Sequence, residues 1–585
     1  MVNIKINGME HAVEEGTTIL EAARAKGIRI PTLCWLKGVN EIGACRICVV
    51  EAKDKGSLIA SCVYPLSIND EGREFYTHSP AVLESRKMTL QLLLSDHDKS
   101  CLSCARSGNC EFQTLCRELG VDDDERFHGE KNKYNVDESS LHMYRDNNKC
   151  VNCRRCVAAC SVTQEIGVIG ANERGFGTNI GCAFDMDLAE SACVSCGQCI
   201  NVCPTGALSE KDNTKEVWEA LSDPEKTVVV QTAPSVRASI GEAFGFPMGV
   251  PVQGKLASAL RYLGFNAVFD TNFGADLTIV EEANELLDRI QNNGALPMIT
   301  SCSPGWVRFC EAYYPEFITN LSSCKSPQQM TGATIKTYWA EKMKVDPSKI
   351  VSVSVMPCVA KKFEIKRMNQ KGQGEYPDVD ISITTRELAK MIDKSGIRFA
   401  ELPEDKFDSP LGSGTGAAII FGATGGVMEA ALRTAVWKLT GENTNSPVEF
   451  KEVRGIQGVK YAEYNVGGTK VKVAVASGLA NARELLEKVK SGKVELHFIE
   501  IMACPGGCVN GGGQIFVPSE IRNFNDIRSE RAKALYNLDE DNKVSRKSHE
   551  NPEVRQIYKE FLGEPGSHKA HDLLHTSYRL SKLFK

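Results

Sequence analysis

The sequence predicts a multidomain protein of the α/β and α+β classes, on three observations. Its 585 residues exceed what one hydrophobic core normally supports, so several modules are expected. Fifteen of its 23 cysteines fall into tight clusters before residue 204, which is typical of small metal-binding modules. From about residue 211 onward, short apolar runs alternate with helical patterns, which indicates a larger α/β domain.

The composition excludes several classes of protein. Hydrophobic residues make up 42% and charged residues 25% of the chain, and no apolar stretch approaches the roughly 20 residues that a membrane span needs. A net charge of -6 without a basic block argues against a nucleic-acid partner. The N-terminus alternates like a strand and carries no secretory signal, so we expect a soluble cytoplasmic protein with reduced thiols. Metal ligation is therefore the expected use of the cysteines.

The first module is expected at residues 1–78. Its start predicts a hairpin with a strand from Val2 to Asn7, a turn at Gly8 and a second short strand, before a helix from about Thr18 to Lys26 that ends at Gly27. Small residues near the cysteines let backbone amides approach the sulfur atoms and stabilise thiolate charge. The module resembles the 2Fe–2S domain of iron-only hydrogenases and of the large iron–sulfur subunit of respiratory complex I, with a zinc site as the alternative. The expected ligands are Cys34, Cys45, Cys48 and Cys62.

The second module is expected at residues 79–126 and opens with an amphipathic helix from about Pro80 to Leu94. A lone histidine near cysteines is more often a zinc ligand or a bystander. Here the spacing resembles that of the 4Fe–4S site with one histidine and three cysteines in the same two families. Replacing one thiolate by a neutral imidazole removes negative charge and should raise the reduction potential of the cluster. The resemblance implies the ligands His97, Cys101, Cys104 and Cys110, whereas Cys116 is expected to be a partly buried free thiol.

An internal repeat is expected to form the third module, at residues 140–210, after an acidic loop-like stretch. A run of four cysteines with gaps of two, two and three residues occurs twice, 43 residues apart, and the second run ends in Pro204. This pattern is typical of two-cluster ferredoxins, in which the fourth cysteine of each run ligates the other cluster. The expected sets are Cys150, Cys153, Cys156 and Cys203 for one cluster, and Cys193, Cys196, Cys199 and Cys160 for the second. With the first two modules, four clusters would form an electron path.

The remainder of the chain predicts an α/β domain. Buried strands are expected at 227–232, 350–355, 471–476 and 495–501, and a helix at 277–292. Three motifs, at 300–306, 356–358 and 502–508, contribute four cysteines from segments some 200 residues apart. Because no local loop or helix could supply them together, they predict one folded metal site made of Cys302, Cys358, Cys504 and Cys508.

The last motif also carries local expectations. Cys504 and Cys508 are four residues apart, so a helical turn would present both sulfur atoms on one face. The glycines at 506, 507 and 511–513 should let a bulky cofactor approach the backbone closely.

The three motifs closely resemble the signature motifs of the iron-only hydrogenases. The resemblance covers essentially the whole chain, including 232–235 and 421–431. It implies reversible interconversion of hydrogen with protons and electrons at an H-cluster, a 4Fe–4S cube joined through a cysteine sulfur to a two-iron unit with carbon monoxide, cyanide and a dithiolate. It also implies an N-terminal β-grasp 2Fe–2S domain, the two cluster domains, a hydrogenase catalytic domain at 211–545 and a small-subunit-like tail at 546–585.

The first motif departs from the family, which has Cys–Cys where this chain has Cys302–Ser303. Cys358, Cys504 and Cys508 match the cube ligands, and Cys508 matches the one that bridges to the two-iron unit. By position, Cys302 takes the place of the proton-donating thiol and Ser303 that of the remaining ligand. Ser303 could ligate through oxygen, Cys302 could shift to ligate, the cube could have a weak or non-protein ligand, or Ser303 could be engineered. We favour Cys302 as the proton donor.

Further residues match the family one by one. Lys361 matches the lysine that pairs with a cyanide, and Glu364 matches its partner. Glu282, Glu285 and Arg289 share one helix face at i, i+3 and i+7, and match a proton path that continues through Ser322 to Cys302. The remaining pocket matches are Ala233, Pro234, Ser326, Gln328, Met356 and Met502, of which the two methionines should pack the iron site.

Some residues are expected to be structural only. Cys182, Cys310 and Cys324 have no partner at ligand spacing and should be buried free thiols. Three histidines near the C-terminus, His568, His571 and His575, are expected to be surface or packing residues.

The electron acceptor is expected to be ferredoxin or flavin-containing subunits that reduce NAD or NADP, because no nucleotide-binding fingerprint follows a strand in this chain. Maturation proteins are expected to supply the diatomic ligands. A complex I-like electron-transfer subunit is one alternative, but it explains only the first 210 residues. The second is a sensory or iron–sulfur assembly relative with little turnover, to which Ser303 gives some weight.

Overall fold

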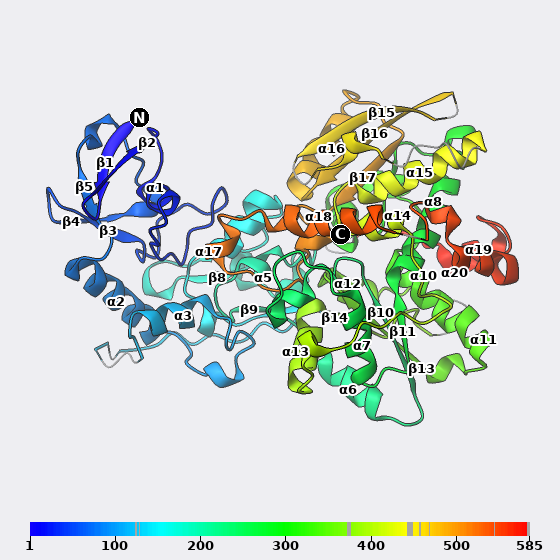
Figure 1. The fold of residues 1–585 in the computed structure, drawn as a ribbon, viewed down its shortest axis with the longest axis horizontal. Helices are drawn as coiled ribbons and strands as arrows, with labels where there is room; N and C mark the ends of the chain where they lie inside the picture. The colour runs from blue at the N-terminus through cyan, green and yellow to red at the C-terminus, as the bar shows by residue number, and fades with distance from the viewer. Residues whose placement is uncertain are drawn as a thin grey trace.

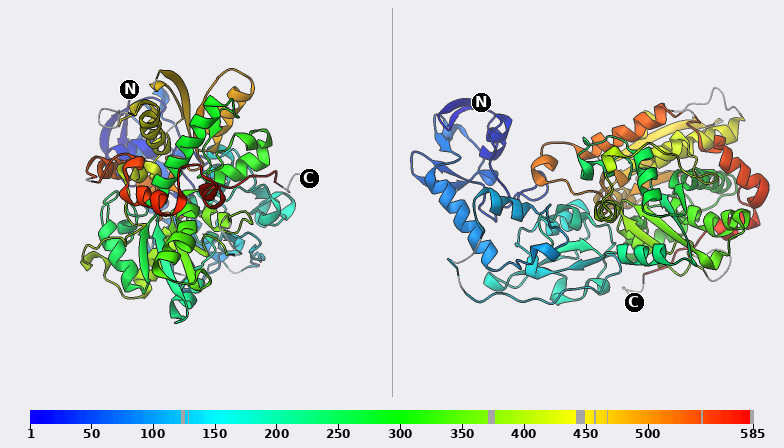
Figure 2. Two further views of the ribbon diagram at one scale, coloured as in Figure 1. Left: turned by 90° about the vertical axis from the view of Figure 1, so that its right-hand side faces the viewer. Right: turned by 60° about the horizontal axis from the view of Figure 1, so that its bottom comes forward.

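The computed structural model describes residues 1–122, 126–127, 129–370, 376–441, 449–455, 458–466, 468–542 and 544–581. Cysteine-rich modules form one end of the chain, and a large domain of mixed helix and sheet forms the other (Figure 1). The right-hand view in Figure 2 shows the N-terminal module and the large domain at opposite ends of an elongated molecule. Within the described ranges, none of the helices combines the length and apolar character that crossing a membrane requires.

The N-terminal module is a five-stranded sheet in the order β2-β1-β5-β3-β4, covered by one helix. Val2 pairs with Val13 and Ile6 with Met9, which confirms the predicted hairpin. The Thr18 hydroxyl caps the helix by accepting a hydrogen bond from the Glu21 amide. Its elements are β1 (Val2–Ile6), β2 (Met9–Val13), α1 (Ile19–Ala25), β3 (Val49–Ala52), β4 (Ser57–Ala60) and β5 (Glu74–Tyr76).

The middle of the chain consists of short elements around the cysteines. Two of its helices, α4 and α5, begin inside the two repeated cysteine runs, each after a residue in the left-handed region, Arg154 and Gly197. Strands β6 and β9 pair with each other and so close the repeat at both ends. The elements are α2 (Pro80–Ser95), α3 (Glu111–Glu118), β6 (Met143–Arg145), α4 (Arg155–Ala158), β7 (Gly170–Asn172), β8 (Asn179–Gly181), α5 (Gln198–Val202) and β9 (Leu208–Glu210).

The large domain contains two four-stranded sheets. The first, in the order β11-β10-β13-β14, is parallel throughout, and its strands are almost entirely buried, as expected for a sheet covered on both faces. Its elements are α6 (Thr214–Ser222), β10 (Thr227–Thr232), α7 (Gln253–Tyr262), β11 (Ala267–Asp270), β13 (Ile350–Met356), α12 (Ala360–Glu364), β14 (Ile381–Thr384) and α13 (Thr385–Lys394). Two of these strands confirm those predicted at 227–232 and 350–355.

The second sheet has the order β12-β17-β16-β15, in which only β15 runs antiparallel to its neighbour. The predicted strand at 471–476 lies inside β16, but the one at 495–501 begins later, at Phe498, because residues 493–497 are an irregular approach to the sheet. The strands are β12 (Met298–Ile299), β15 (Val459–Val466), β16 (Thr469–Ser477) and β17 (Phe498–Met502).

Helix α8 (Thr271–Gln291) packs against α10 and α15. It begins six residues before the predicted start at 277, because the Asp270 side chain caps it by accepting a hydrogen bond from the Asn272 amide. The other helices are α9 (Pro304–Tyr313), α10 (Pro327–Thr334), α11 (Ala340–Met343), α14 (Gly416–Ile419), α15 (Gly426–Thr440), α16 (Leu479–Lys490), α17 (Ser519–Arg522), α18 (Ile527–Glu540), α19 (Pro552–Ile557) and α20 (His568–Leu574).

The ferredoxin-like repeat is joined to the large domain by buried contacts. The Arg386 guanidinium pairs with Glu210 at 2.9 Å and donates to the carbonyls of Gly512 and Gln514. A Cβ atom added to Gly197 would lie 2.9 Å from the Gly512 Cα, so the two main chains are in direct contact there. The repeat is therefore held firmly against the loop that follows Cys508.

Candidate active site

The site is built where parallel strands end. Ala233 follows β10 and Cys358 follows β13 in one sheet, while Cys302 and Cys504 follow β12 and β17 in the other. Binding sites in α/β folds commonly lie outside the carboxyl ends of such strands. The topology therefore brings together motifs that are far apart in the sequence.

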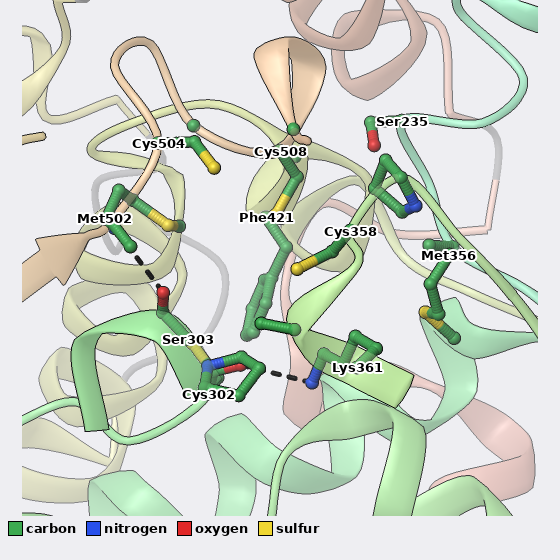
Figure 3. Close-up of a pocket in the computed structure, with 18 of the residues that line it drawn as sticks. Ser235, Cys302, Ser303, Met356, Cys358, Lys361, Phe421, Met502, Cys504 and Cys508 are labelled. Carbon is green, nitrogen blue, oxygen red and sulfur yellow. Dashed lines mark hydrogen bonds between the residues drawn. The ribbon is translucent and has the colours of Figure 1, made fainter. Parts of the chain in front are cut away.

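These segments surround one cavity of about 90 Å³. Figure 3 shows the side chains of the three motifs facing a common space. Its lining includes the predicted residues Ala233, Pro234, Cys302, Ser303, Gln328, Met356, Cys358, Lys361, Met502, Cys504 and Cys508. Ser326 and Glu364 do not line the cavity but hydrogen-bond to Lys361, which does. Of the predicted proton path, Cys302 lines the cavity, whereas Glu282, Glu285, Arg289 and Ser322 do not. Ser235 and Phe421 also line the cavity. Both lie in segments that resemble the family, 232–235 and 421–431, but neither is among the predicted site residues.

The link between Cys504 and Cys508 is not the predicted helical turn. Gly506 and Gly507 have φ angles of 87° and 96°, which a helix does not contain, and a short 3₁₀ turn starts only at Cys508. Burial raises the pKa of Cys358, of Cys504 and, to about 12, of Cys508, so metal binding must displace their protons.

The glycine run after this motif has a different use from the one expected. A Cβ atom on Gly511 would lie 2.0 Å from the Pro357 carbonyl oxygen, and one on Gly512 would lie 2.4 Å from the Cys196 carbonyl oxygen. Gly511 to Gly513 thus let other parts of the main chain approach. The prediction that glycines make room for a cofactor was wrong for Gly506, Gly512 and Gly513, which do not line the cavity, whereas Gly507 and Gly511 do line it.

Ser303 precedes α9 and faces the cavity. Its Oγ accepts a hydrogen bond from the Ala503 amide at 3.4 Å, which places it beside the loop that carries Cys504. The neighbouring Cys302 also lines the cavity, and its carbonyl oxygen accepts a hydrogen bond from Lys361 at 3.2 Å. Burial, with Glu282 nearby, raises the pKa of the Cys302 thiol well above its usual value, so this side chain carries a proton.

Lys361 is the centre of a buried polar network. Its Nζ atom donates to the Glu364 carboxylate at 2.9 Å and to the Ser326 hydroxyl at 2.9 Å. Ser326 and Gln328 both donate to the same Glu364 oxygen, at 2.9 and 2.8 Å. The ammonium is therefore fixed at the cavity wall by a carboxylate that lies behind it, with three donors on one oxygen.

A row of side chains leads from Cys302 to the edge of the domain. Glu282 on α8 is buried, and neither of its carboxylate oxygens has a hydrogen-bond partner among the described residues. Burial and the nearby charge of Glu285 raise the pKa of Glu282 to about 8. Glu285 accepts from Ser322 at 3.0 Å and pairs with Arg289 at 2.7 Å. Arg289 is partly exposed, so the row ends near solvent.

The first two modules bring their predicted ligands close together in part. The Cys48 and Cys62 sulfur atoms are 3.2 Å apart, and a hydrogen bond with Cys34 lowers the pKa of Cys45 to about 6. His97 directly follows the residue that ends α2, and Cys110 caps α3, with Cys101 and Cys104 in the turns between them. Burial lowers the pKa of His97 to about 4, which keeps its ring neutral, as a metal ligand requires.

The repeat brings its cysteines together across the two runs. One cavity of about 30 Å³ is lined by Cys160, Cys193, Cys196 and Cys199. In the other group, burial and the nearby Cys153, Cys203 and Cys150 raise the pKa of Cys156 well above its usual value. Each group thus contains the fourth cysteine of the opposite run. Among the free thiols, Cys116, Cys182, Cys310 and Cys324 are buried, as predicted.

The donor set fits iron–sulfur chemistry. Thiolates are the usual ligands of such clusters, and this cavity is lined by the thiols of Cys358, Cys504 and Cys508 together with a fixed ammonium. Its other walls are mainly apolar, with Phe421, Met356 and Met502 among them. This is the environment expected for a bulky cluster with anionic ligands that must be shielded from water.

Known families match the chain along most of its length. Residues 226–512 match the family of the iron-only hydrogenase large subunit, C-terminal domain, and 525–580 match the iron hydrogenase small subunit. Residues 1–71 match a 2Fe–2S iron–sulfur cluster binding domain, 86–125 the iron–sulfur binding region of NADH-ubiquinone oxidoreductase-G, and 149–207 a 4Fe–4S dicluster domain.

Individual relatives are similar over the full length. The NADP-reducing hydrogenase subunit HndD of Solidesulfovibrio fructosivorans is 48% identical over 99% of both chains, and iron hydrogenase 1 of Clostridium pasteurianum is 45% identical over 99% of this chain and 100% of its own. A variant of apo FeFe-hydrogenase HydA1 from Chlamydomonas reinhardtii covers 63% of this chain and 99% of its own, with 42% identity and a TM-score of 0.56. These full-length matches favour a hydrogenase over a complex I-like subunit. The chain therefore belongs to the iron-only hydrogenases and is an oxidoreductase in which 2Fe–2S and 4Fe–4S domains precede the hydrogenase domain.

Proposed function

We propose that hydrogen is oxidised and protons are reduced in the cavity between Cys302 and Cys508. The observation that carries this assignment is the convergence of four distant cysteines on one buried cavity, backed by Glu282. Cys358, Cys504 and Cys508 would hold the cube, and Cys508 would bridge to the two-iron unit. When bound, the H-cluster supplies the iron centre at which hydrogen is split or formed.

We propose that this chain's own side chains move the proton. During hydrogen oxidation, the Cys302 thiol gives its proton to the Glu282 carboxylate, which passes it toward Ser322 and Glu285. The hydrogen bond from Ser322 to Glu285 supports this order, as does the partly exposed position of Arg289 beyond Glu285. Lys361 would bind a cyanide, since Glu364 fixes its ammonium at the cavity wall.

The electrons would leave through the N-terminal clusters. The contact between Gly512 and the Cys196 loop supports a transfer from the cube to the cluster of Cys160, Cys193, Cys196 and Cys199. One five-stranded sheet with one helix supports the β-grasp assignment of the 2Fe–2S module.

Since one relative is named an NADP-reducing hydrogenase subunit, we propose NADP-reducing flavin subunits as the partner, with ferredoxin as the alternative acceptor. The residue limits of the domains stay predictions.

Infrared spectroscopy tests the cofactor assignment. After maturation, the protein should show stretching bands of iron-bound carbon monoxide and cyanide that the protein expressed without maturation proteins lacks. Cys508→Ala should lose these bands but keep the spectra of the N-terminal clusters, because its thiol would serve only the H-cluster, as a ligand of the cube and the bridge to the two-iron unit. A matured protein with full iron content and no such bands would leave the proposal without support.

Ser303 is proposed to leave one position of the cube with a weaker ligand than thiolate, while Cys302 keeps the proton. Ser303→Cys should then change the electron paramagnetic resonance spectrum of the cube and lower its potential, since thiolate is the more negative ligand. Ser301→Cys is the matched control, because the Ser301 hydroxyl donates to the Cys324 carbonyl and does not line the cavity. Identical spectra and hydrogen uptake in wild type and Ser303→Cys would rule out a special role for Ser303.

A further inference from the structure

A group of metal-binding side chains lies outside the catalytic cavity, where the C-terminal tail covers α8. Glu285 lies on α8, Cys324 lies in the loop before α10, and His575 is the residue directly after α20. Each offers one ligand atom, a carboxylate oxygen, a sulfur or a ring nitrogen, and these atoms lie within 4.8 Å of one another. The prediction that Cys324 and His575 are structural residues only does not account for this arrangement.

The main chain holds the three segments together without any metal. Cys324 and His575 form an antiparallel bridge. On either side of it, the Lys325 amide donates to the Leu574 carbonyl at 2.8 Å, and the Thr576 amide donates to the Ser323 carbonyl at 2.7 Å. The ligand positions are therefore already fixed, which reduces the entropy that metal binding would otherwise cost.

The three side chains lie close together and are mostly shielded from solvent. The Cys324 side chain is fully buried, whereas the side chains of Glu285 and His575 are 14% and 6% exposed. The Cys324 sulfur lies 3.7 Å from Oε2 of Glu285, and the other oxygen of this carboxylate pairs with Arg289. Oε2 is thus the oxygen nearest the sulfur, and it also accepts hydrogen bonds from the Ser322 hydroxyl and the Ser323 amide, both at 3.0 Å, so a metal would displace the hydroxyl.

The local charge favours a cation at the sulfur. Burial, and then the carboxylates of Glu285, Glu282 and Glu281, raise the pKa of the Cys324 thiol well above its usual value. Glu282, with a pKa of about 8, is largely neutral at pH 7, so the negative charge near the sulfur comes from Glu285 and Glu281, and this charge attracts a divalent cation. Arg289 offsets the charge of Glu285 through their pair. The two ring nitrogens of His575 contact the Ser323 hydroxyl at 2.8 Å and Glu281 at 3.2 Å, so a metal bound to His575 would displace one of these contacts.

We propose that Glu285, Cys324 and His575 form a binding site for Zn²⁺. A mixed set of sulfur, nitrogen and oxygen ligands suits this borderline-soft cation, with water as the fourth ligand. Tetrahedral zinc sites place their ligand atoms roughly 3.5 Å apart, so side-chain adjustments alone close the site. On binding, a sulfur–zinc bond replaces the sulfur–hydrogen bond of Cys324, and the released proton leaves to solvent.

The consequence for turnover rests on the proposed proton path. Glu285 is its last carboxylate before Arg289, and a zinc ion on Oε2 occupies the atom that accepts the Ser322 hydroxyl. Zinc should therefore block the exit of protons and inhibit hydrogen oxidation, while the H-cluster bands in the infrared spectrum stay in place.

The test uses the matured holoenzyme with zinc sulfate. Equilibrium dialysis with metal analysis should find one tightly bound zinc ion per chain, and zinc should abolish most hydrogen oxidation. Cys324→Ala and His575→Gln should each weaken zinc binding by at least about 100-fold, since the loss of even an outer-shell partner costs 10 to 100-fold. Each activity is expressed relative to the same variant without zinc. Magnesium should neither bind nor inhibit, because it prefers oxygen ligands.

Matched controls separate this site from other thiols and histidines. Cys310→Ala removes a buried free thiol elsewhere, and His568→Gln removes an exposed histidine of α20; both should bind zinc as the wild type does. If Cys324→Ala fails to fold, judged by iron content, Cys324→Ser takes its place. Equal zinc binding in wild type, Cys324 and His575 variants overturns the site. Zinc bound at the site without inhibition establishes the site but overturns the proton path through Glu285.

Discussion

Glu282→Gln is expected to slow hydrogen oxidation by at least about 100-fold, because an amide cannot accept and release a proton as a general acid–base group does. Burial and Glu285 raise the pKa of Glu282 to about 8, so the carboxyl is largely neutral at pH 7. The neutral amide then resembles the native side chain in shape and charge, and the fold should be preserved. Hydrogen-dependent dye reduction measures the rate, and electron paramagnetic resonance checks that the clusters are intact.

The pKa of Glu282 also predicts how the rates of hydrogen oxidation and proton reduction change with pH. In hydrogen oxidation Glu282 must be ionised to accept the Cys302 proton, so the wild-type rate should rise as pH increases through about 8, whereas proton reduction should fall over the same range. Glu282→Gln should lose both trends. Glu281→Gln is the control on the same helix, since Glu281 binds the tail through Tyr558 and His575. A Glu282→Gln enzyme with the wild-type rate would refute the path.

Lys361→Met is expected to lose both the H-cluster and about 3–5 kcal/mol of stability, because removing one partner leaves a buried carboxylate unpaired. Glu364 is buried, and with Lys361 gone it keeps only the hydroxyl of Ser326 and the amide of Gln328. Urea unfolding of the protein expressed without maturation proteins measures the stability, and infrared spectra after maturation measure cofactor retention.

A double variant separates the two effects. Lys361→Met with Glu364→Gln removes the buried charge pair as a whole, so most of the stability should return. The infrared bands and the activity should not return, because the cavity still lacks its ammonium. A single Lys361→Met protein with full bands would contradict the proposed contact with cyanide. A double variant as unstable as the single one would contradict the charge explanation.

The sequence was most informative where chemistry depends on residue type. Buried strands such as 227–232 carry an apolar pattern that few other structures produce, and the cysteine spacings are dictated by cluster geometry. The turn after Cys504 was predicted incorrectly because spacing alone does not distinguish a helical turn from one with two left-handed glycines, Gly506 and Gly507. The early start of α8 depended on the Asp270 cap, which acts within a buried region.

Other features depend on contacts between distant segments. The zinc-binding group needs α8, the loop at Cys324 and the tail at His575 in one place, and nothing in the local sequence indicates that the tail lies there. Similarly, the use of Gly512 became apparent only from the Cys196 loop packed against it. Sequence patterns describe single elements well, whereas such junctions are determined by tertiary packing.

The contact between Gly197 and Gly512 fixes a distance that matters for electrons. Electron tunnelling between two redox centres weakens steeply as their separation grows, and at this junction the main chains of Gly197 and Gly512 are in direct contact beside the Val359 side chain. The Cys504 sulfur lies 4.0 Å from the Cys196 carbonyl oxygen, so a ligand position of the proposed cube and one of the neighbouring cluster almost touch. Because neither glycine has a side chain, the two segments approach as closely as main chains can, which keeps the separation between the two proposed clusters short.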